Sequence, residues 1–155
     1  VKKEYPRAII AYYHWTHARD AMSAANDYSQ ICPCSPVIII GHSYGGSEAI
    51  SNAEKLRGNR ASPMVLLTLD PVGRSTWMHP DFKSANDISF WGNVHSVPSE
   101  YDFSDFVADL GGQFGSIWRK SKPDVNEDSS ASHGDTRGLY DQIRDRLKQE
   151  VPPDL

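Results

Sequence analysis

The stretch from Val37 to Gly46 constrains the fold more than any other part of this 155-residue chain. It begins with four β-branched residues, Val-Ile-Ile-Ile, which are typical of a short buried strand. Gly-His-Ser-Tyr-Gly-Gly follows directly, and a helix-compatible segment runs from there to Leu56. This order predicts a buried strand, a sharp turn and a helix, with nothing between them.

Ser43 lies at the centre of the Gly-x-Ser-x-Gly pattern in this turn. A strand-to-helix turn of this kind holds one serine hydroxyl at the top of a sheet. Gly41 and Gly45 lack a Cβ and are expected to let the two backbones approach closely. The first helical N–H groups would lie where negative charge develops on oxygen during acyl transfer. We predict that Ser43 is a nucleophile; the alternative is a glycine-rich turn that only packs.

The rest of the chain predicts a single α/β domain spanning residues 1–155. Expected strands cover residues 7–13, 37–40, 64–69 and 88–95. Expected helices cover residues 18–29, 44–56 and 101–110, and an amphipathic last helix carries Leu139, Tyr140, Ile143 and Leu147. Alternation of strands and helices indicates a mostly parallel sheet flanked by helices, with functional groups at the carboxyl ends of the strands.

A serine nucleophile needs a base, and the base needs an acid to orient it. Asp70 ends the strand that follows the Ser43 helix, so both residues should lie at one edge of the sheet. We predict that Asp70 is the acid, with Asp102 and Asp105 as reserve candidates. The alternative is that Asp-Pro simply begins a turn.

Three histidines follow Asp70 and compete for the role of base: His79, His95 and His133. His133 lies in a polar, flexible loop that enters the last helix, from which it can reach the sheet edge, and it is the preferred base. His95 ends a strand and is more simply interpreted as a local hydrogen-bonding side chain. His42 adjoins Ser43 and is expected to point away from it.

These residues resemble the α/β-hydrolase superfamily of serine esterases, lipases and thioesterases. The elbow is close to the Gly-His-Ser-x-Gly-Gly form of lipases, and Leu-Asp-Pro at residues 69–71 looks like the acid placement of pancreatic-type lipases. The resemblance implies a small, shortened α/β-hydrolase fold, with Ser43 as nucleophile, His133 as base and Asp70 as acid. It implies a carboxylic ester hydrolase that needs no cofactor. An acyl thioesterase and a non-catalytic module of the same fold are the alternatives.

The chain departs from the family at the oxyanion loop. No His-Gly motif follows the first expected strand, and His-Trp-Thr-His occupies residues 14–17 instead. In the resemblance, Tyr44 gives the first backbone N–H of the oxyanion hole. Trp15 or Thr16 would then give the second. His14 and His17 also suggest a metal site, but no third ligand has a convincing spacing, and none is predicted.

The substrate class depends on two apolar segments. Trp77, Met78 and Phe82 follow the acid and form either a lid or acyl-chain wall over the pocket, or a packed connection. The apolar face of residues 101–110 is expected to belong more to the core than to a lipid contact. An exposed apolar rim would favour lipid or long-acyl esters, and a buried one would favour short soluble esters.

Composition excludes some partners. The formal net charge of −4 has no basic stripe, which argues against nucleic acid. No apolar run approaches the ~20 residues of a membrane span, and the first residues lack a signal-peptide core. Cys32 and Cys34 are separated only by Pro33, so two free thiols are expected rather than a disulfide. The expected partner is a small-molecule or lipid ester.

Overall fold

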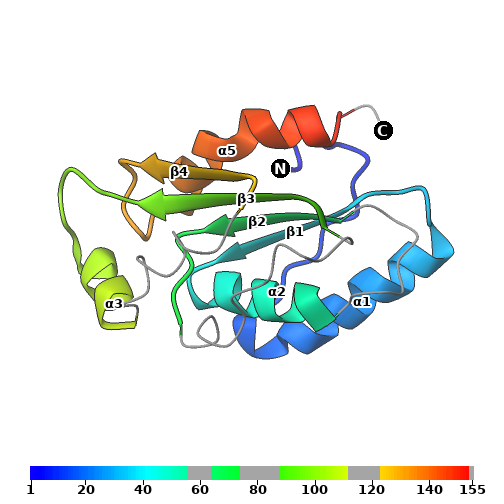
Figure 1. Cartoon of the computed structure of the whole chain (residues 1–155), viewed down its shortest axis with the longest axis horizontal. Helices are drawn as coiled ribbons and strands as arrows, with labels where there is room; N and C mark the ends of the chain where they lie inside the picture. Colours follow the sequence, from blue (N-terminus) through cyan, green and yellow to red (C-terminus); the bar gives the residue numbers. More distant parts are fainter. Residues whose placement is uncertain (56–63, 74–87, 112–122, 154–155) are drawn as a thin grey trace.

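A four-stranded sheet forms the centre of the molecule (Figure 1). The computed structural model describes residues 1–55, 64–73, 88–111 and 123–153. The strands are β1 (Val37–His42), β2 (Met64–Leu69), β3 (Ile88–Ser96) and β4 (Val125–Ser129). They lie side by side in chain order, and every neighbouring pair is parallel. The described part of the chain therefore has the small α/β architecture that the sequence predicts.

Helices cover both faces of the sheet and its carboxyl edge. Figure 1 shows α1 (Ala18–Ile31) and α2 (Tyr44–Lys55) on one face and α5 (Thr136–Glu150) on the other. The short helix α3 (Phe103–Gly111) lies beyond the arrowheads of the strands. A single 3₁₀ turn, η1 (Trp15–His17), precedes α1.

Two apolar clusters hold these layers together. β2 is buried at all six positions, because it lies inside the sheet and is covered on both faces. On the α5 face, the cluster combines alternate β2 residues with one face of α5, namely Val65, Leu67, Leu69, Leu139, Ile143 and Leu147. On the α2 face, the cluster includes Met64, Leu66, Trp91, Ala49, Ile50 and Ala53. The site residues thus stand on a rigid, well-packed sheet.

The expected first strand, residues 7–13, is wrong. The segment is irregular, and it leaves Ile9 82% and Tyr12 90% exposed. β4, in contrast, is a strand that we did not expect, because its Val-Asn-Glu-Asp-Ser sequence has no apolar pattern. As an edge strand whose side chains alternate in exposure, it needs only backbone pairing with β3. Both cysteines are described, and no disulfide joins them.

The apolar face of α3 also lies in an unexpected place. Phe103 is 79% exposed, Leu110 is 72% exposed, and Phe106 and Val107 are about half exposed. The side that faces the protein carries Asp105 and Ala108, both buried. The expectation that the apolar face belongs to the core is therefore wrong. An acidic side chain holds α3 to the rest of the molecule instead, as described below.

Candidate active site

Ser43 occupies the sharp turn between β1 and α2. Its φ of 56° is in the left-handed region, which is strained for a residue with a side chain. Three backbone hydrogen bonds hold it there. The Ser43 N–H donates to the Leu69 carbonyl at 3.1 Å, and the Ser43 carbonyl accepts from the N–H groups of Gly46 and Val72. These bonds tie the turn to the end of β2, directly before Asp70.

Two glycines make this turn possible. A Cβ on Gly41 would lie 2.6 Å from the Gly45 carbonyl oxygen, and a Cβ on Gly46 would lie 2.8 Å from the Pro71 Cβ. Both approaches are too close for real atoms. A Cβ on Gly45 would meet its nearest neighbour, the Trp15 Cβ, at an ordinary 3.9 Å. The close approaches therefore require Gly41 and Gly46 rather than the expected pair, Gly41 and Gly45.

Asp70 follows β2 directly and is the second residue with a strained backbone. Its φ is 42°, and its N–H donates to the Val94 carbonyl of β3 at 2.7 Å. The side chain is buried and turns toward the same edge of the sheet as Ser43. Among the described residues other than glycine, positive φ occurs only at Ser43 and Asp70. Local strain is thus found at two of the three residues that the sequence proposes for chemistry.

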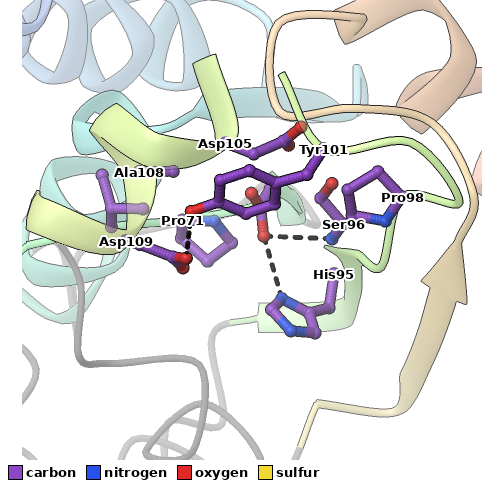
Figure 2. Close-up of a pocket in the computed structure, with 10 residues that line it drawn as sticks. Pro71, His95, Ser96, Pro98, Tyr101, Asp105, Ala108 and Asp109 are labelled. Atoms are coloured by element: carbon purple, nitrogen blue, oxygen red, sulfur yellow. Dashed lines mark hydrogen bonds and ion pairs between the residues drawn. The ribbon is translucent and has the colours of Figure 1, made fainter. Parts of the chain in front are cut away.

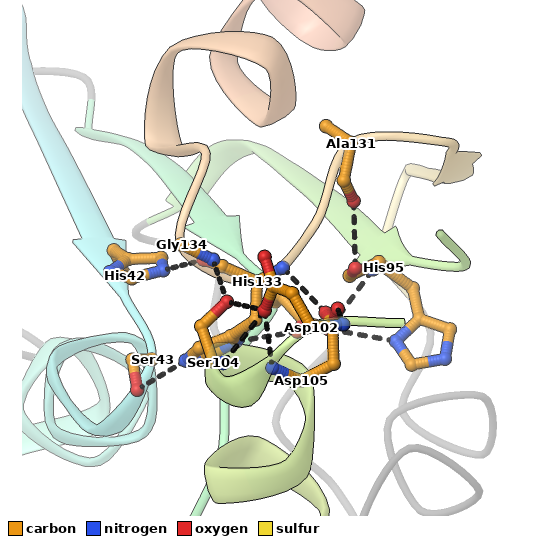
Figure 3. A network of polar contacts seen from close by, with 11 residues as sticks. His42, Ser43, His95, Asp102, Ser104, Asp105, Ala131, His133 and Gly134 are labelled. Atoms are coloured by element: carbon orange, nitrogen blue, oxygen red, sulfur yellow. Dashed lines mark hydrogen bonds and ion pairs between the residues drawn. The ribbon is translucent and has the colours of Figure 1, made fainter. Parts of the chain in front are cut away.

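Ser43, His133 and Asp70 form one chain of hydrogen bonds (Figure 3). His133 Nε2 lies 2.9 Å from the Ser43 hydroxyl oxygen, and His133 Nδ1 lies 2.7 Å from Asp70 Oδ2. The imidazole is buried, whereas Ser43 is half-buried. The fold therefore brings together three residues that are up to 90 positions apart in the sequence.

The Asp70 carboxylate is stabilised in its charged form. Burial alone would raise its pKa, but hydrogen bonds from His133, His95 and the Ser96 N–H outweigh burial and lower the pKa below its ordinary value. A carboxylate that stays ionised can only accept hydrogen bonds. His133 must therefore carry a hydrogen on Nδ1, which leaves Nε2 of the neutral ring to accept the Ser43 proton.

Four side chains hold the loop that carries His133. Asp105 accepts the His133 N–H at 2.8 Å, and the Ser104 hydroxyl accepts the Gly134 N–H at 2.9 Å. The Ser96 hydroxyl donates to the Ala131 carbonyl at 2.7 Å. On the other side, His42 Nε2 lies 2.7 Å from the His133 carbonyl oxygen. Figure 3 shows these contacts converging from β1, β3 and α3, so the loop expected to be flexible is fixed on several sides.

His42 has a role that the sequence did not indicate. Its Nε2 meets the His133 carbonyl, and its ring lies beside the His133 ring, with centroids 4.8 Å apart. Burial lowers its pKa and favours the neutral ring. A neutral ring must carry its hydrogen on Nε2 to donate to the His133 carbonyl. The residue before Ser43 therefore supports the His133 loop, a role with no local signal in the sequence.

The reserve acids have structural roles instead. Asp102 precedes α3, and its Oδ1 accepts the N–H groups of Ser104 and Asp105. Asp105 Oδ2 accepts the Asp102 N–H in return, which completes a capping box. The Asp-x-x-Asp spacing carried this signal. Neither residue contacts a histidine ring in any recorded bond, and Asp105 supports the His133 backbone.

The two residues assigned to the oxyanion hole are neighbours. The Trp15 ring packs edge-on against the Tyr44 ring with centroids 4.8 Å apart. η1 therefore lies over the first turn of α2, where backbone N–H groups have no partner within the helix. The arrangement brings Trp15 against Tyr44, the residue that follows Ser43.

A pocket opens beside Asp70 on the side of His95 (Figure 2). Its walls include Asp70, His95, Pro98, Tyr101 and Asp109, and the Tyr101 hydroxyl donates to Asp109 across it. Ser43 and His133 are not among the lining residues. The proposed substrate residues Trp77, Met78 and Phe82, and the alternative base His79, lie outside the described residues.

The described residues show neither a metal centre nor a membrane-spanning helix. Within residues 1–55, 64–73, 88–111 and 123–153, no three His, Cys, Asp or Glu side chains are grouped to hold a metal ion. No helix in these ranges has the length and apolar character of a membrane span.

Comparison of the chain with protein-family models, with curated proteins and with solved structures found no match.

Proposed function

We propose that this protein is a serine hydrolase of the α/β-hydrolase type, which cleaves a carboxylic ester through an acyl-enzyme. The hydrogen-bond chain from Ser43 through His133 to Asp70 carries the proposal. A serine hydroxyl, a neutral imidazole and an ionised carboxylate in this order are what general-base activation of a serine requires. The strained, glycine-dependent turn at Ser43 supports the same assignment.

The chemistry follows from the protons in this chain. His133 Nε2 takes the hydroxyl proton as Ser43 Oγ attacks the ester carbonyl, and the charge on the carbonyl oxygen is met by the N–H groups of Tyr44 and Trp15. The His133 imidazolium, stabilised by Asp70, then gives its proton to the leaving alkoxide. Water repeats the sequence on the acyl-enzyme, which releases the acid and restores the Ser43 hydroxyl.

The exposed apolar face of α3 supports a lipid or long-acyl substrate. Ser104 and Asp105 fix α3 against the His133 loop, so the exposed apolar face belongs to the helix that supports the proposed base. Phe103 and Phe106 pack together there, with ring centroids 6.3 Å apart and both exposed. A surface of this kind gains more from a long acyl chain than from an acetyl group, at about 0.8 kcal/mol per buried methylene.

The experiment is intact-mass analysis after incubation with a fluorophosphonate. Wild type should gain one adduct, and Ser43→Ala should gain none. Ser51→Ala is the matched control, because it removes a half-buried serine from α2, the helix that follows Ser43. It should label like wild type. Absence of an adduct on folded wild type would overturn the proposal and favour the non-catalytic module.

A series of 4-nitrophenyl esters from C2 to C16 tests the substrate class. We expect kcat/KM to rise with chain length, and Phe103→Ser with Leu110→Ser to remove that rise while leaving the acetate rate unchanged. A preference for short esters would contradict the role of α3. Matched oxyester and thioester pairs test the alternative, because a thioesterase would strongly prefer the thioester.

A further inference from the structure

A second histidine shares the Asp70 carboxylate. His95 Nδ1 lies 2.9 Å from Asp70 Oδ1, and the Ser96 N–H donates to the same oxygen at 3.0 Å. The other oxygen, Oδ2, faces His133 at 2.7 Å. Both contacts from His95 and Ser96 come from the end of β3, which Figure 2 shows beside the carboxylate.

We propose that His95 is a positioning residue that fixes the Asp70 carboxylate so that Oδ2 is aimed at His133. The inference rests on the proposed function, because the residue positioned is its acid. A carboxylate can turn about its Cβ–Cγ bond, and a single partner on one oxygen does not stop it. His95 and Ser96 hold Oδ1 from one side while His133 holds Oδ2 from the other, so rotation would break all three bonds.

His95 is linked to His133 through the Asp70 carboxylate. No recorded bond joins it to Ser43, and it borders the pocket on the far side of the carboxylate. Because ionised Asp70 only accepts hydrogen bonds, His95 must donate from Nδ1 in either protonation state. Its side chain is 30% exposed, so a substitution there does not open a cavity in the core.

The shared carboxylate also couples His95 to the hydrogen bond made by His133. Without the donor on Oδ1 the carboxylate is free to turn, and the bond from His133 Nδ1 to Oδ2, which orients the imidazole, should weaken. The other charged or titratable groups that contact His133 are His42 from β1 and Asp105 from α3. Both stay in place when His95 is replaced, so a change at His133 reports on the shared carboxylate.

Two variants separate positioning from simple packing. His95→Leu removes the donor, whereas the amide nitrogen of His95→Asn stands the same number of bonds from the backbone as Nδ1. We expect kcat/KM of the Leu variant to fall about 10- to 100-fold, through kcat rather than KM. The Asn variant should stay within about threefold of wild type. Val97→Ala, half-exposed two residues further along, controls for local disturbance.

The Nδ1–H proton of His133, which donates to Asp70 Oδ2, tests the same point by NMR without turnover. A shift or loss of its downfield signal in His95→Leu but not in His95→Asn supports the proposal. An unchanged signal in folded His95→Leu, or an equal change in both variants, would overturn it. If wild type fails to react with a fluorophosphonate, the proposed function fails, whereas the NMR result still decides whether His95 and His133 are coupled through Asp70.

Discussion

Two irregular segments of similar length differ in how firmly they are held, and the difference is the opposite of what their compositions suggest. Residues 130–135 are polar and carry His133, yet bonds from three elements fix this loop against the sheet edge. Residues 8–14 are largely apolar and aromatic, yet Ile9 and Tyr12 are almost fully exposed. Within the described chain, residues 9–13 make no hydrogen bond. Partners for the backbone, rather than apolar content, decide which segment is fixed.

The largest expected effect lies in the polar loop. His133→Ala should lower kcat for ester hydrolysis by about 10⁴–10⁶-fold, because the Ser43 proton then has no acceptor. Steady-state kinetics on folded protein measure this. Ser132→Ala, the adjacent loop residue, is the control and should stay close to wild type. A fall of less than tenfold in His133→Ala would show that the loop is fixed for a reason other than catalysis.

Asp105→Ala should release the loop without removing any of the three proposed catalytic residues. The change leaves the N–H groups of His133 and Asp102 without their acceptor, which should lower the free energy of unfolding by about 1–3 kcal/mol. kcat should fall as well, by about 10- to 100-fold, because His133 is no longer held. Urea unfolding and kinetics measure the two effects. Asp109→Ala on the same helix is the control, and equal losses in both variants would contradict the role of Asp105.

Acid should loosen the same loop through Asp70. Its pKa is lowered in the folded protein, so its contribution to stability is present above its ordinary value of 3.8 and is lost as pH falls toward the folded value. Urea unfolding from pH 7 to pH 2 should show a loss on the order of 2 kcal/mol in wild type. Asp70→Asn should lack this part of the loss. Parallel curves for the two proteins would show that the carboxylate does not stabilise the fold.

The smallest effects should come from the apolar segment. Ile9→Ser and Tyr12→Ser should each change the free energy of unfolding by no more than about 0.5 kcal/mol, because both side chains already face water. Tyr5→Ser is the contrast, since Tyr5 is buried in the α5 cluster and should cost several kcal/mol, roughly 3–5. A large loss for Ile9→Ser would mean that the segment packs against something after all.

Periodicity predicted the elements whose burial follows from their own residues. The β-branched run at residues 37–40 and the apolar run at 64–69 lie in strands β1 and β2, and the last helix buries the expected Leu139, Ile143 and Leu147. β4 was missed because an edge strand needs no apolar pattern. The strand expected at residues 7–13 was wrong because apolar residues alone do not supply a pairing partner.

The candidate site likewise has a part that the sequence predicted and a part that it did not. Ser43, Asp70 and His133 were proposed from chain order and from the rule that strand ends meet at one edge, and the structure brings them within hydrogen-bond distance of one another. The supporting contacts from His42, Ser96, Ser104 and Asp105 join residues 28 to 91 positions apart. Sequence spacing contains no signal for such pairs, because they depend on where whole elements dock.

The order of the strands has a consequence for synthesis. Because β1 to β4 lie side by side in chain order, a growing chain can add each strand to the one before it as it emerges from the ribosome. Ser43 and Asp70 are then placed early, but His133 follows β4 and precedes α5. The Ser43 hydroxyl gains its hydrogen-bond partner only when the loop that carries His133 docks. An unfinished chain would therefore carry the proposed nucleophile in an unreactive form.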